Sequence, residues 1–325
     1  MIYEFAVDPE VVAGALTDKA LFLELYRGFG PGTPRRMSRF PKDWLKRVHS
    51  LLPSEEQLPP GVGPVRRKQA ADLMKRLADE GVRNGREWCS ESNWVENAVQ
   101  QDETVPFRSV LALSPPKRPH FFSPEDVLSP EAPAEWEPAR GVTFSRTPDG
   151  YLGMCSPMVR LAKRVVLVDP YARAKNSAEK LVVGGIIELL SRNPSATSFT
   201  LVGKVGIATE DTVEAYRSNW GRALARYAGR GVQITIVRVA DAKMKEPHNR
   251  YLLTELGGIQ TGNGIDGNRP EAIDTAELLS QSRGCSEGQV LDSTWDWAWT
   301  TFALDLQNRF DMVEGPFELT STGFE

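Results

Sequence analysis

The stretch KEPHNRYLLTELGGIQTGNGID, residues 245–266, decides how the second half of the chain is interpreted. It contains His248, then Arg250 two positions later, and a glycine-rich run follows. If RYLLTE is a strand, alternation puts His248 and Arg250 on one face and leaves Tyr251 and Leu253 for a packed opposite face. A histidine beside arginine, whose forked donors match phosphate oxygens, suits a tetrahedral anion. The alternative is a core strand that carries a structural histidine.

Around this stretch, short β-branched runs alternate with helical periodicity. Strands are predicted at 164–168, 198–203 and 232–239, and helices at 177–192 (capped by Ser177) and 209–230 (capped by Thr209). Strands alternating with helices predict an α/β domain, whose mixed or parallel sheet is covered by helices on both faces.

The tail from Arg269 onward is less regular. Its stretch STWDWAWTTFALDLQNRF fits a tryptophan-rich helix or a strand leading into one. Trp295, Trp297 and Trp299 could form a stacking platform for bases or pack in a core or interface.

The spacing within the opening stretch resembles the signature of the phospholipase D superfamily. That signature is a His-x-Lys-x4-Asp run, followed six residues later by Gly-Ser and then Asn; here the frame reads His248, Arg250, Glu255, Gly262 and Asn263. The nearest variant is a branch with a His-Asp-Arg motif. It includes the carboxy-terminal domain of microtubule-interacting and trafficking proteins and bacterial domains of defence systems. The resemblance covers residues 145–325.

The resemblance implies a role for each matching residue. His248 would attack phosphorus as the nucleophile, Arg250 would clamp the phosphate, and Glu255 would orient or balance charge. Gly262 and Asn263 would line the phosphate pocket, and neither a metal nor another cofactor is implied. The motif occurs once, with arginine, glutamate and asparagine in place of lysine, aspartate and serine. An active enzyme would therefore need two copies of His248 facing each other in a homodimer.

Two further residues are candidates because ligands collect beyond the carboxyl ends of strands in such sheets. Asp169 follows the strand at 164–168, and Lys204 follows the strand at 198–203. Both are predicted to bind phosphate. The alternatives are that Asp169 caps the next turn and that Lys204 is a surface lysine.

The first half of the chain is organised differently. Residues 113–141 contain seven prolines and little periodicity, which predicts an irregular linker or a strap over a surface. The expected organisation is a mainly helical domain over 1–112, this linker, and a phospholipase D-like α/β domain over 142–325. In the first domain, Asp8 and Pro9 are typical of a helix start, and PFRSVLAL is typical of a short strand.

Positive charge gathers in this helical half. From residue 35 to residue 86 there are 13 Lys or Arg against 6 Asp or Glu. Either these are solvated helix faces, or they form a groove for DNA or RNA whose affinity comes from phosphate contacts. The residues expected to bind nucleic acid in the second case are Arg35, Arg36, Arg39, Lys42, Arg66 and Arg67.

Composition argues against several classes of protein. Three cysteines without CxxC spacing favour a reducing compartment, and three histidines make a transition-metal site improbable. No apolar run is long enough to span a bilayer, and the amino terminus lacks the pattern of a secretion signal. Neither GxGxxG nor GxxxxGK[ST] occurs. The expected location is the cytoplasm, without a membrane partner.

The resulting hypothesis is a metal-independent phosphodiesterase, nuclease-like, with a site shared across a homodimer and a possible place in a multi-component bacterial defence system. The alternative hypothesis is an inactive phospholipase D-like module that binds nucleic acid or scaffolds a protein complex.

Overall fold

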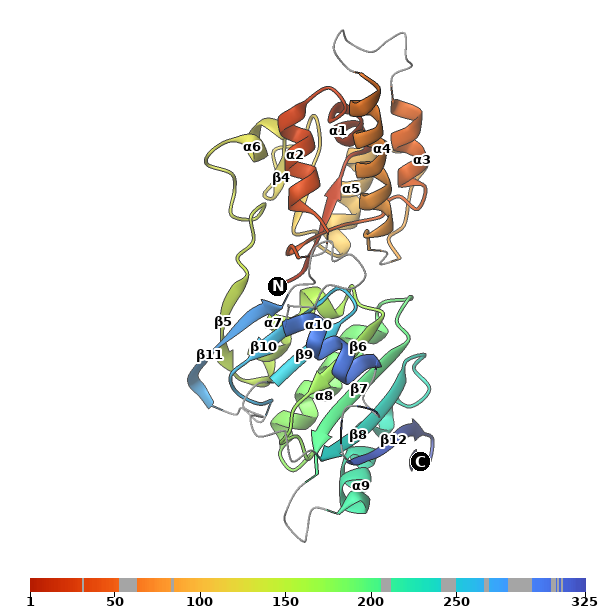
Figure 1. Cartoon of the computed structure of the whole chain (residues 1–325), viewed down its shortest axis with the longest axis vertical. Coiled ribbons are helices and arrows are strands. Elements are labelled where there is room, and N and C mark those ends of the chain that lie inside the picture. Colours follow the sequence, from red (N-terminus) through yellow and green to blue (C-terminus); the bar gives the residue numbers. More distant parts are fainter. Residues whose placement is uncertain are drawn as a thin grey trace. The chain divides into compact units, whose positions relative to one another are not determined.

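The chain divides into two compact units (Figure 1). One unit spans Ile2–Ala139, and the other comprises Arg140–Glu325 together with Met1. The computed structural model describes residues 1–30, 32–52, 63–82, 85–205, 212–240, 250–265, 269–279, 294–304, 308, 310 and 312–325.

A parallel sheet forms the middle of the amino-terminal unit, where the sequence predicted a mainly helical domain. Among the described residues its order is β2-β1-β3-β4. Alternate residues of β1 face opposite ways: Phe5 and Val7 join one apolar cluster, and Ala6 joins another. Both faces of this small sheet are therefore covered. The strands are β1 (Tyr3–Val7), β2 (Arg35–Met37), β3 (Ser109–Leu111) and β4 (Phe121–Phe122).

Four of the described helices of this unit begin at a residue whose side chain caps them, namely α1, α2, α5 and α6. Asp8 caps the first helix by accepting the N–H of Glu10, as expected from the Asp8-Pro9 pair. Asn93 and Glu96 form a reciprocal capping box at α5. The helices are α1 (Pro9–Gly14), α2 (Lys19–Gly28), α3 (Trp44–Leu51), α4 (Pro64–Asp79), α5 (Trp94–Thr104) and α6 (Pro124–Leu128).

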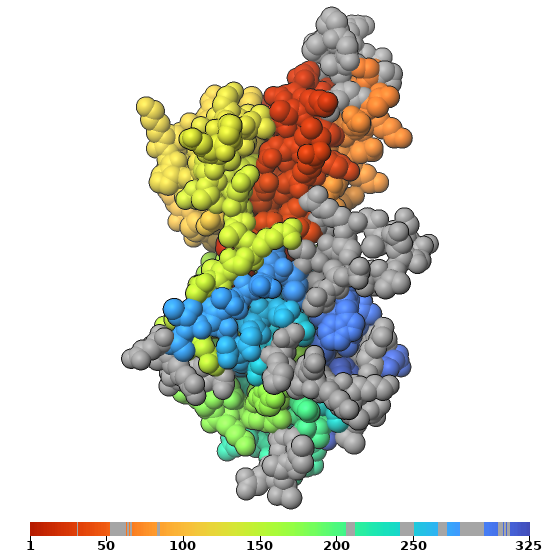
Figure 2. Space-filling model, turned by 60° about the vertical axis from the view of Figure 1, so that its left-hand side comes forward, coloured from red at the N-terminus to blue at the C-terminus, as the bar shows by residue number. Residues whose placement is uncertain are grey.

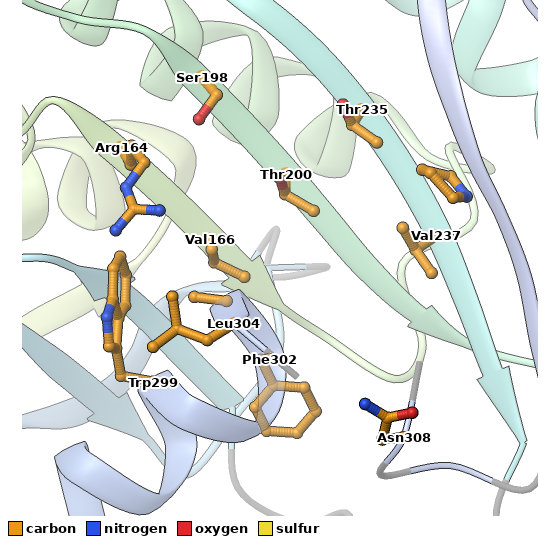
Figure 3. A pocket seen from close by; sticks show the side chains of 12 residues that line it. Arg164, Val166, Ser198, Thr200, Thr235, Val237, Trp299, Phe302, Leu304 and Asn308 are labelled. Carbon is orange, nitrogen blue, oxygen red and sulfur yellow. The ribbon is translucent and has the colours of Figure 1, made fainter. Parts of the chain in front are cut away.

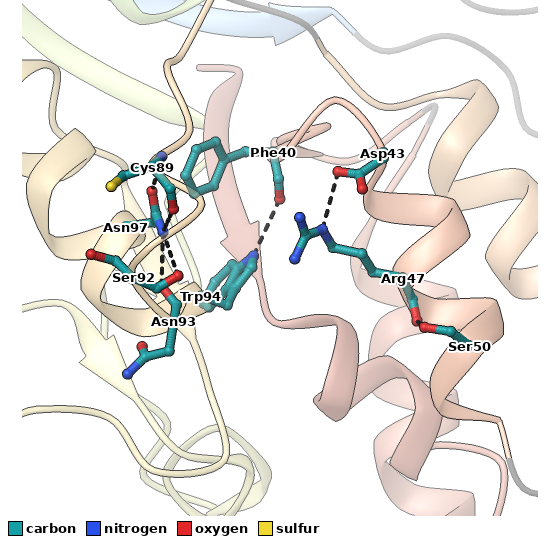
Figure 4. Close-up of polar contacts among 9 residues, drawn as sticks. All are labelled: Phe40, Asp43, Arg47, Ser50, Cys89, Ser92, Asn93, Trp94 and Asn97. Carbon is teal, nitrogen blue, oxygen red and sulfur yellow. Dashed lines mark hydrogen bonds and ion pairs between the residues drawn. The ribbon is translucent and has the colours of Figure 1, made fainter.

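The loop before α5 is held by one buried amide (Figure 4). Asn97 accepts the N–H of Cys89 at 2.7 Å, and its Nδ2 donates to the carbonyls of Cys89, Ser92 and Asn93. Next to it, Trp94 Nε1 donates to the carbonyl of Phe40 at 3.3 Å. These bonds fix the loop against the second apolar cluster.

The proline-rich segment is more ordered than its sequence predicts. It supplies β4 and α6, the latter with Ser123 as cap and Pro124 at its first turn. Further along, Trp136 is fully buried, packs edge-on against Phe5 and Phe29, and donates from Nε1 to Glu24 at 2.8 Å. The segment is therefore a strap anchored in the amino-terminal core.

A mixed sheet forms the carboxy-terminal unit, in agreement with the predicted α/β class. Among the described residues its strand order is β13-β12-β8-β7-β6-β9-β10-β11-β5. The central strands β6, β7 and β8 are parallel, and their neighbours pair antiparallel. Figure 2 shows the yellow-green surface of β5 beside the blue surface of β11, its antiparallel partner. The strands are β5 (Gly141–Arg146), β6 (Arg164–Val168), β7 (Ser198–Lys204), β8 (Gln233–Ala240), β9 (Arg250–Thr254), β10 (Gly257–Thr261), β11 (Arg269–Leu279), β12 (Met312–Thr320) and β13 (Gly323–Phe324).

Helices cover both faces of this sheet, as the alternating pattern predicted. Val166, Val168 and Leu253 face α10 (Thr294–Trp299) and the π-helical turn Thr300–Leu304. The opposite face is covered by α7 (Pro148–Val159), α8 (Ser177–Ser191) and α9 (Val213–Leu224).

Replacing Trp136 tests whether the strap belongs to the amino-terminal core. Trp136→Ala should lower the free energy of unfolding of this unit by about 3–5 kcal/mol, because it empties a large buried site. Trp136→Phe should cost about 1–2 kcal/mol, since the ring stays and the bond to Glu24 is lost. Denaturant titration measures both, with the exposed neighbour substitution Glu135→Ala as control. Equal stability of all three variants would show that the strap is only a tether.

The cap of α1 should make stability depend on pH. Burial raises the pKa of the Asp8 carboxyl from 3.8 to about 6, against the opposing effect of the bond from the Glu10 N–H. The folded state then holds this proton more tightly than the unfolded state, so stability is lost as the pH rises from 3.8 to about 6.

Asp8→Asn keeps an acceptor for the Glu10 N–H and cannot ionise. Relative to this variant, the native chain should lose on the order of 1–3 kcal/mol of unfolding free energy between those pH values. Parallel curves for the two proteins in chemical denaturation across pH 3.5–7, roughly the interval that brackets both pKa values, would contradict the assignment.

Candidate functional site

The strand order brings five of the sequence-predicted residues to the same end of the central strands in the carboxy-terminal sheet. This end, at the carboxyl ends of the parallel strands, is called the Arg250 edge below. Asp169 follows β6 and Lys204 ends β7, so both lie at the carboxyl ends of parallel strands. Arg250 begins β9, which runs antiparallel to β6 and therefore starts at the same edge. Gly262 and Asn263 follow β10, whose last residue pairs with Arg250.

Arg250 is fixed in place by a hydrogen bond and an aromatic ring. Its Nη1 donates to the carbonyl of Gly262 at 3.0 Å, and its guanidinium carbon lies 5.1 Å from the centroid of the Tyr171 ring. The hairpin between β9 and β10 has a two-residue turn, which brings the start of one strand beside the end of the other. Arg250 therefore lies beside the glycine-rich run.

Asp169 is a buried positioning residue at this edge. Its Oδ1 accepts the N–H of Tyr171 and its Oδ2 accepts the N–H of Ile265, each at 2.9 Å. The bond from Tyr171 agrees with the alternative that Asp169 caps the turn after β6. A carboxylate engaged in this way repels an anion, so its placement does not favour the predicted role of direct phosphate binding.

Two residues that the sequence analysis missed lie at the same end of the sheet. Asp274 on β11 is buried and accepts the N–H of Asn263 at 3.2 Å and that of Thr275 at 2.8 Å. Tyr151 on α7 is fully enclosed, and burial, with Cys155, Asp169 and Asp274 nearby, raises the pKa of its hydroxyl well above the usual value. Asp274 interrupts an apolar alternation, which is the signal that could have identified it.

Lys204 is the candidate cation with the simplest surroundings. Its carbonyl accepts Nη2 of Arg173 at 2.6 Å, and its N–H donates to Pro170 at 3.3 Å. Its side chain is half-buried and forms no ion pair with the described residues. Lys204 and Arg250 thus lie at the same end of β7 and β9, the two strands that flank β6.

Glu255 does not join this group. It lies in the turn after β9, roughly 17 Å along the strand from Arg250 at 3.3–3.4 Å per residue. Its Oε1 accepts the N–H of Lys163 at 2.7 Å, and its Oε2 accepts that of Arg164 at 3.1 Å. The carboxylate thus binds the start of β6, at the other end of the strands from Arg250.

His248 and the three tryptophans of the carboxy-terminal tail are the other residues considered from the sequence. His248 lies outside the described residues, as does the side chain of Trp295. Trp299 is buried and packs in the core under the sheet, which fits the packing alternative. Trp297 is 51% exposed, with its ring near those of Tyr251 and Phe302.

The predicted nucleic-acid surface does not form as expected. Arg35 is buried against Phe29 and Trp136 and pairs with Glu24 at 2.7 Å, and Arg36 is 3% exposed. These two cations cannot contact a phosphate backbone, because they lie inside the unit. Lys42 is exposed, Arg39 and Arg67 are half-buried, and the side chain of Arg66 lies outside the described residues.

Comparison with known proteins adds little to this geometry. No family model matches the chain, and no curated protein matches it. One similar solved structure is that of TrmBL2, an archaeal chromatin protein described as showing a novel mode of DNA binding. It is 11% identical over 73% of this chain and 74% of the other, with a TM-score of 0.24, too low to support any argument about this protein.

The described residues form neither a metal cluster nor a membrane-spanning helix. No group of three or more histidine, cysteine or acidic side chains in these ranges could hold a metal ion. No helix in them is both long and apolar enough to cross a membrane.

Substituting Glu255 separates its structural role from the catalytic one implied by the motif. Glu255→Ala should lower the free energy of unfolding by about 1–2 kcal/mol, because two backbone N–H groups lose their acceptor. Anion binding at Arg250 should stay unchanged. Thermal unfolding measures the first effect, with the exposed Glu277→Ala on β11 as control. Unchanged stability with lost anion binding would place Glu255 in the site instead.

Proposed function

We propose that the carboxy-terminal unit is a phosphodiester-processing domain of the phospholipase D type, with its site at the edge that holds Arg250. The observation that carries the proposal is the convergence of Arg250, Lys204 and the Gly262–Asn263 loop at the carboxyl ends of the parallel strands. Ligands of α/β sheets bind at such edges.

His248, two positions before Arg250 in the sequence, is the proposed nucleophile. In the proposed reaction the imidazole attacks phosphorus, the P–O bond to the leaving group breaks, and water then releases the phosphoryl group from histidine. Arg250 and Lys204 offset the charge on the phosphoryl oxygens, so these residues carry the step without a metal.

The proposal includes a second copy of the chain, because the leaving oxygen needs a proton donor. The other histidines, His49 and His120, belong to the amino-terminal unit. His120 is already engaged with Asp102 at 3.0 Å. A second His248, from a two-fold related copy, would supply the proton.

A non-catalytic anion-binding module is the second candidate. The observation in its favour is that the Asn263 and Ile265 N–H groups donate to Asp274 and Asp169. Those two donors are therefore directed at carboxylates of the protein itself. Such a module would bind nucleic acid or a phosphorylated partner through Arg250 and Lys204 and release it unchanged.

Hydrolysis measured in EDTA distinguishes the two functions. Bis(p-nitrophenyl) phosphate, single-stranded DNA and single-stranded RNA are the substrates, and His248→Ala should abolish turnover. Lys204→Ala should reduce turnover by roughly 100–1000-fold, the range for losing a charge-stabilising group. The control is His49→Ala, in the other unit, with circular dichroism to verify folding. Salt-sensitive binding of DNA or RNA without turnover would support the second candidate.

Mixing native and His248→Ala chains tests the shared site. In co-refolded equal mixtures, a site that needs two histidines retains about a quarter of the activity, because only that fraction of random dimers is fully native. Independent sites retain about half of the activity. A linear decline with the mutant fraction, or a monomer by light scattering with full activity, would overturn the shared-site mechanism.

A further inference from the structure

A hollow of about 300 Å³ lies on the α10 face of the carboxy-terminal sheet (Figure 3). Its floor is formed by the amino-terminal halves of β6, β7 and β8, and one wall is formed by the end of α10 and the π-helical turn. The carboxyl ends of the same strands hold the Arg250 edge, so the hollow and that edge lie toward opposite ends of the strands.

The floor is polar at the centre of the sheet. Ser198 and Thr200 on β7 and Thr235 on β8 face the hollow and are half-exposed. The alternate residues on the other face, such as Phe199 and Leu201, are fully buried. Central parallel strands are usually apolar on both faces. Hydroxyls on adjacent strands there, without a hydrogen bond to any described residue, indicate a surface that receives a polar partner.

An arginine stands at one end of this floor. The guanidinium carbon of Arg164 lies 5.0 Å from the centroid of the Trp299 ring, and the side chain has no hydrogen bond or ion pair with the described residues. The Arg164 backbone is held by the bond from its N–H to Glu255. The aromatic face and the anchored backbone orient the guanidinium, whose fork of donors matches a planar carboxylate or a phosphate.

The wall beside the arginine is apolar. Trp299 and Phe302 are 7% and 5% exposed, and Leu304, at 61% exposure, extends the apolar surface. The hollow thus combines one cationic end, a row of hydroxyls and an aromatic wall. This combination fits a ligand with one anionic end and an apolar body, and about 300 Å³ is at the small end of ligand pockets.

We propose that this hollow is a binding site for a small organic anion, either a carboxylate or a phosphate monoester on a flat apolar body the size of one ring. Arg164 binds the anionic group, Thr200 and Thr235 donate hydrogen bonds to its oxygens or to a polar substituent, and Trp299 and Phe302 contact the body. The site is independent of the proposed hydrolytic function.

Titration of the full chain with phenylacetate, phenyl phosphate and neutral 2-phenylethanol tests this site. Calorimetry and ligand-detected NMR should show saturable binding of at least one anion, and the stronger of the two identifies the anionic group. The neutral alcohol should bind at least about tenfold more weakly, since it lacks the charge-assisted bonds to Arg164.

Four variants locate the binding. Arg164→Gln should weaken anion binding about tenfold or more, and Thr200→Val combined with Thr235→Val should weaken it to a lesser degree. Arg192→Gln, at the exposed residue that follows α8, is the matched control for loss of one positive charge and should bind as the native chain does. Arg250→Ala should retain the binding that Arg164→Gln loses, which separates this site from the proposed active site.

Two results would overturn the proposal. One is the absence of saturable binding for both anions up to roughly 10 mM, where even dissociation constants weaker than about 1 mM would be detected. The other is equal affinity of the native chain and Arg164→Gln, with both folded by circular dichroism. In that case any binding lies elsewhere.

Discussion

The carboxylate of Asp169 accepts backbone N–H groups from Tyr171 and from Ile265, which is 96 positions further along the chain. A buried charge is stable only when it is hydrogen-bonded, so this carboxylate ties the loop after β6 to the loop after β10. Asp274 holds the second loop from the other side through Asn263. The relative positions of Tyr171, Arg250 and Gly262 depend on these bonds, and with them any chemistry at this edge.

The central strands of the carboxy-terminal sheet could be predicted because their sequences are strongly patterned. RVVLV and SFTLVG are short β-branched runs with clear ends, and the structure places β6 and β7 on them. In the sheet of the amino-terminal unit only β3 was predicted, as the strand in PFRSVLAL, because β2 and β4 span three and two residues, too few for alternation to stand out. Counting charges also failed there, since a count cannot distinguish an arginine paired inside the fold, such as Arg35, from one in solvent.

The candidate site was predictable where the chain itself enforces proximity. The hairpin pairs the start of β9 with the end of β10, so Arg250 meets Gly262 whatever the rest of the fold does. Glu255 shows that spacing in a motif does not ensure closeness in space. Five residues along a strand carry its side chain to the other end of that strand. Asp274 reaches Asn263 from β11, a strand that was not predicted, although its place in an apolar alternation is a signal in the sequence.

The burial of Trp136 changes where the chain can be divided for separate study. A fragment that stops at residue 112 would remove β4, α6 and this indole, and would leave Phe5 and Phe29 facing solvent. A fragment that stops at residue 139 keeps all of them, in line with the limits of the compact unit. Recombinant expression of the amino-terminal half alone should therefore use the later end point, although the prolines suggest the earlier one.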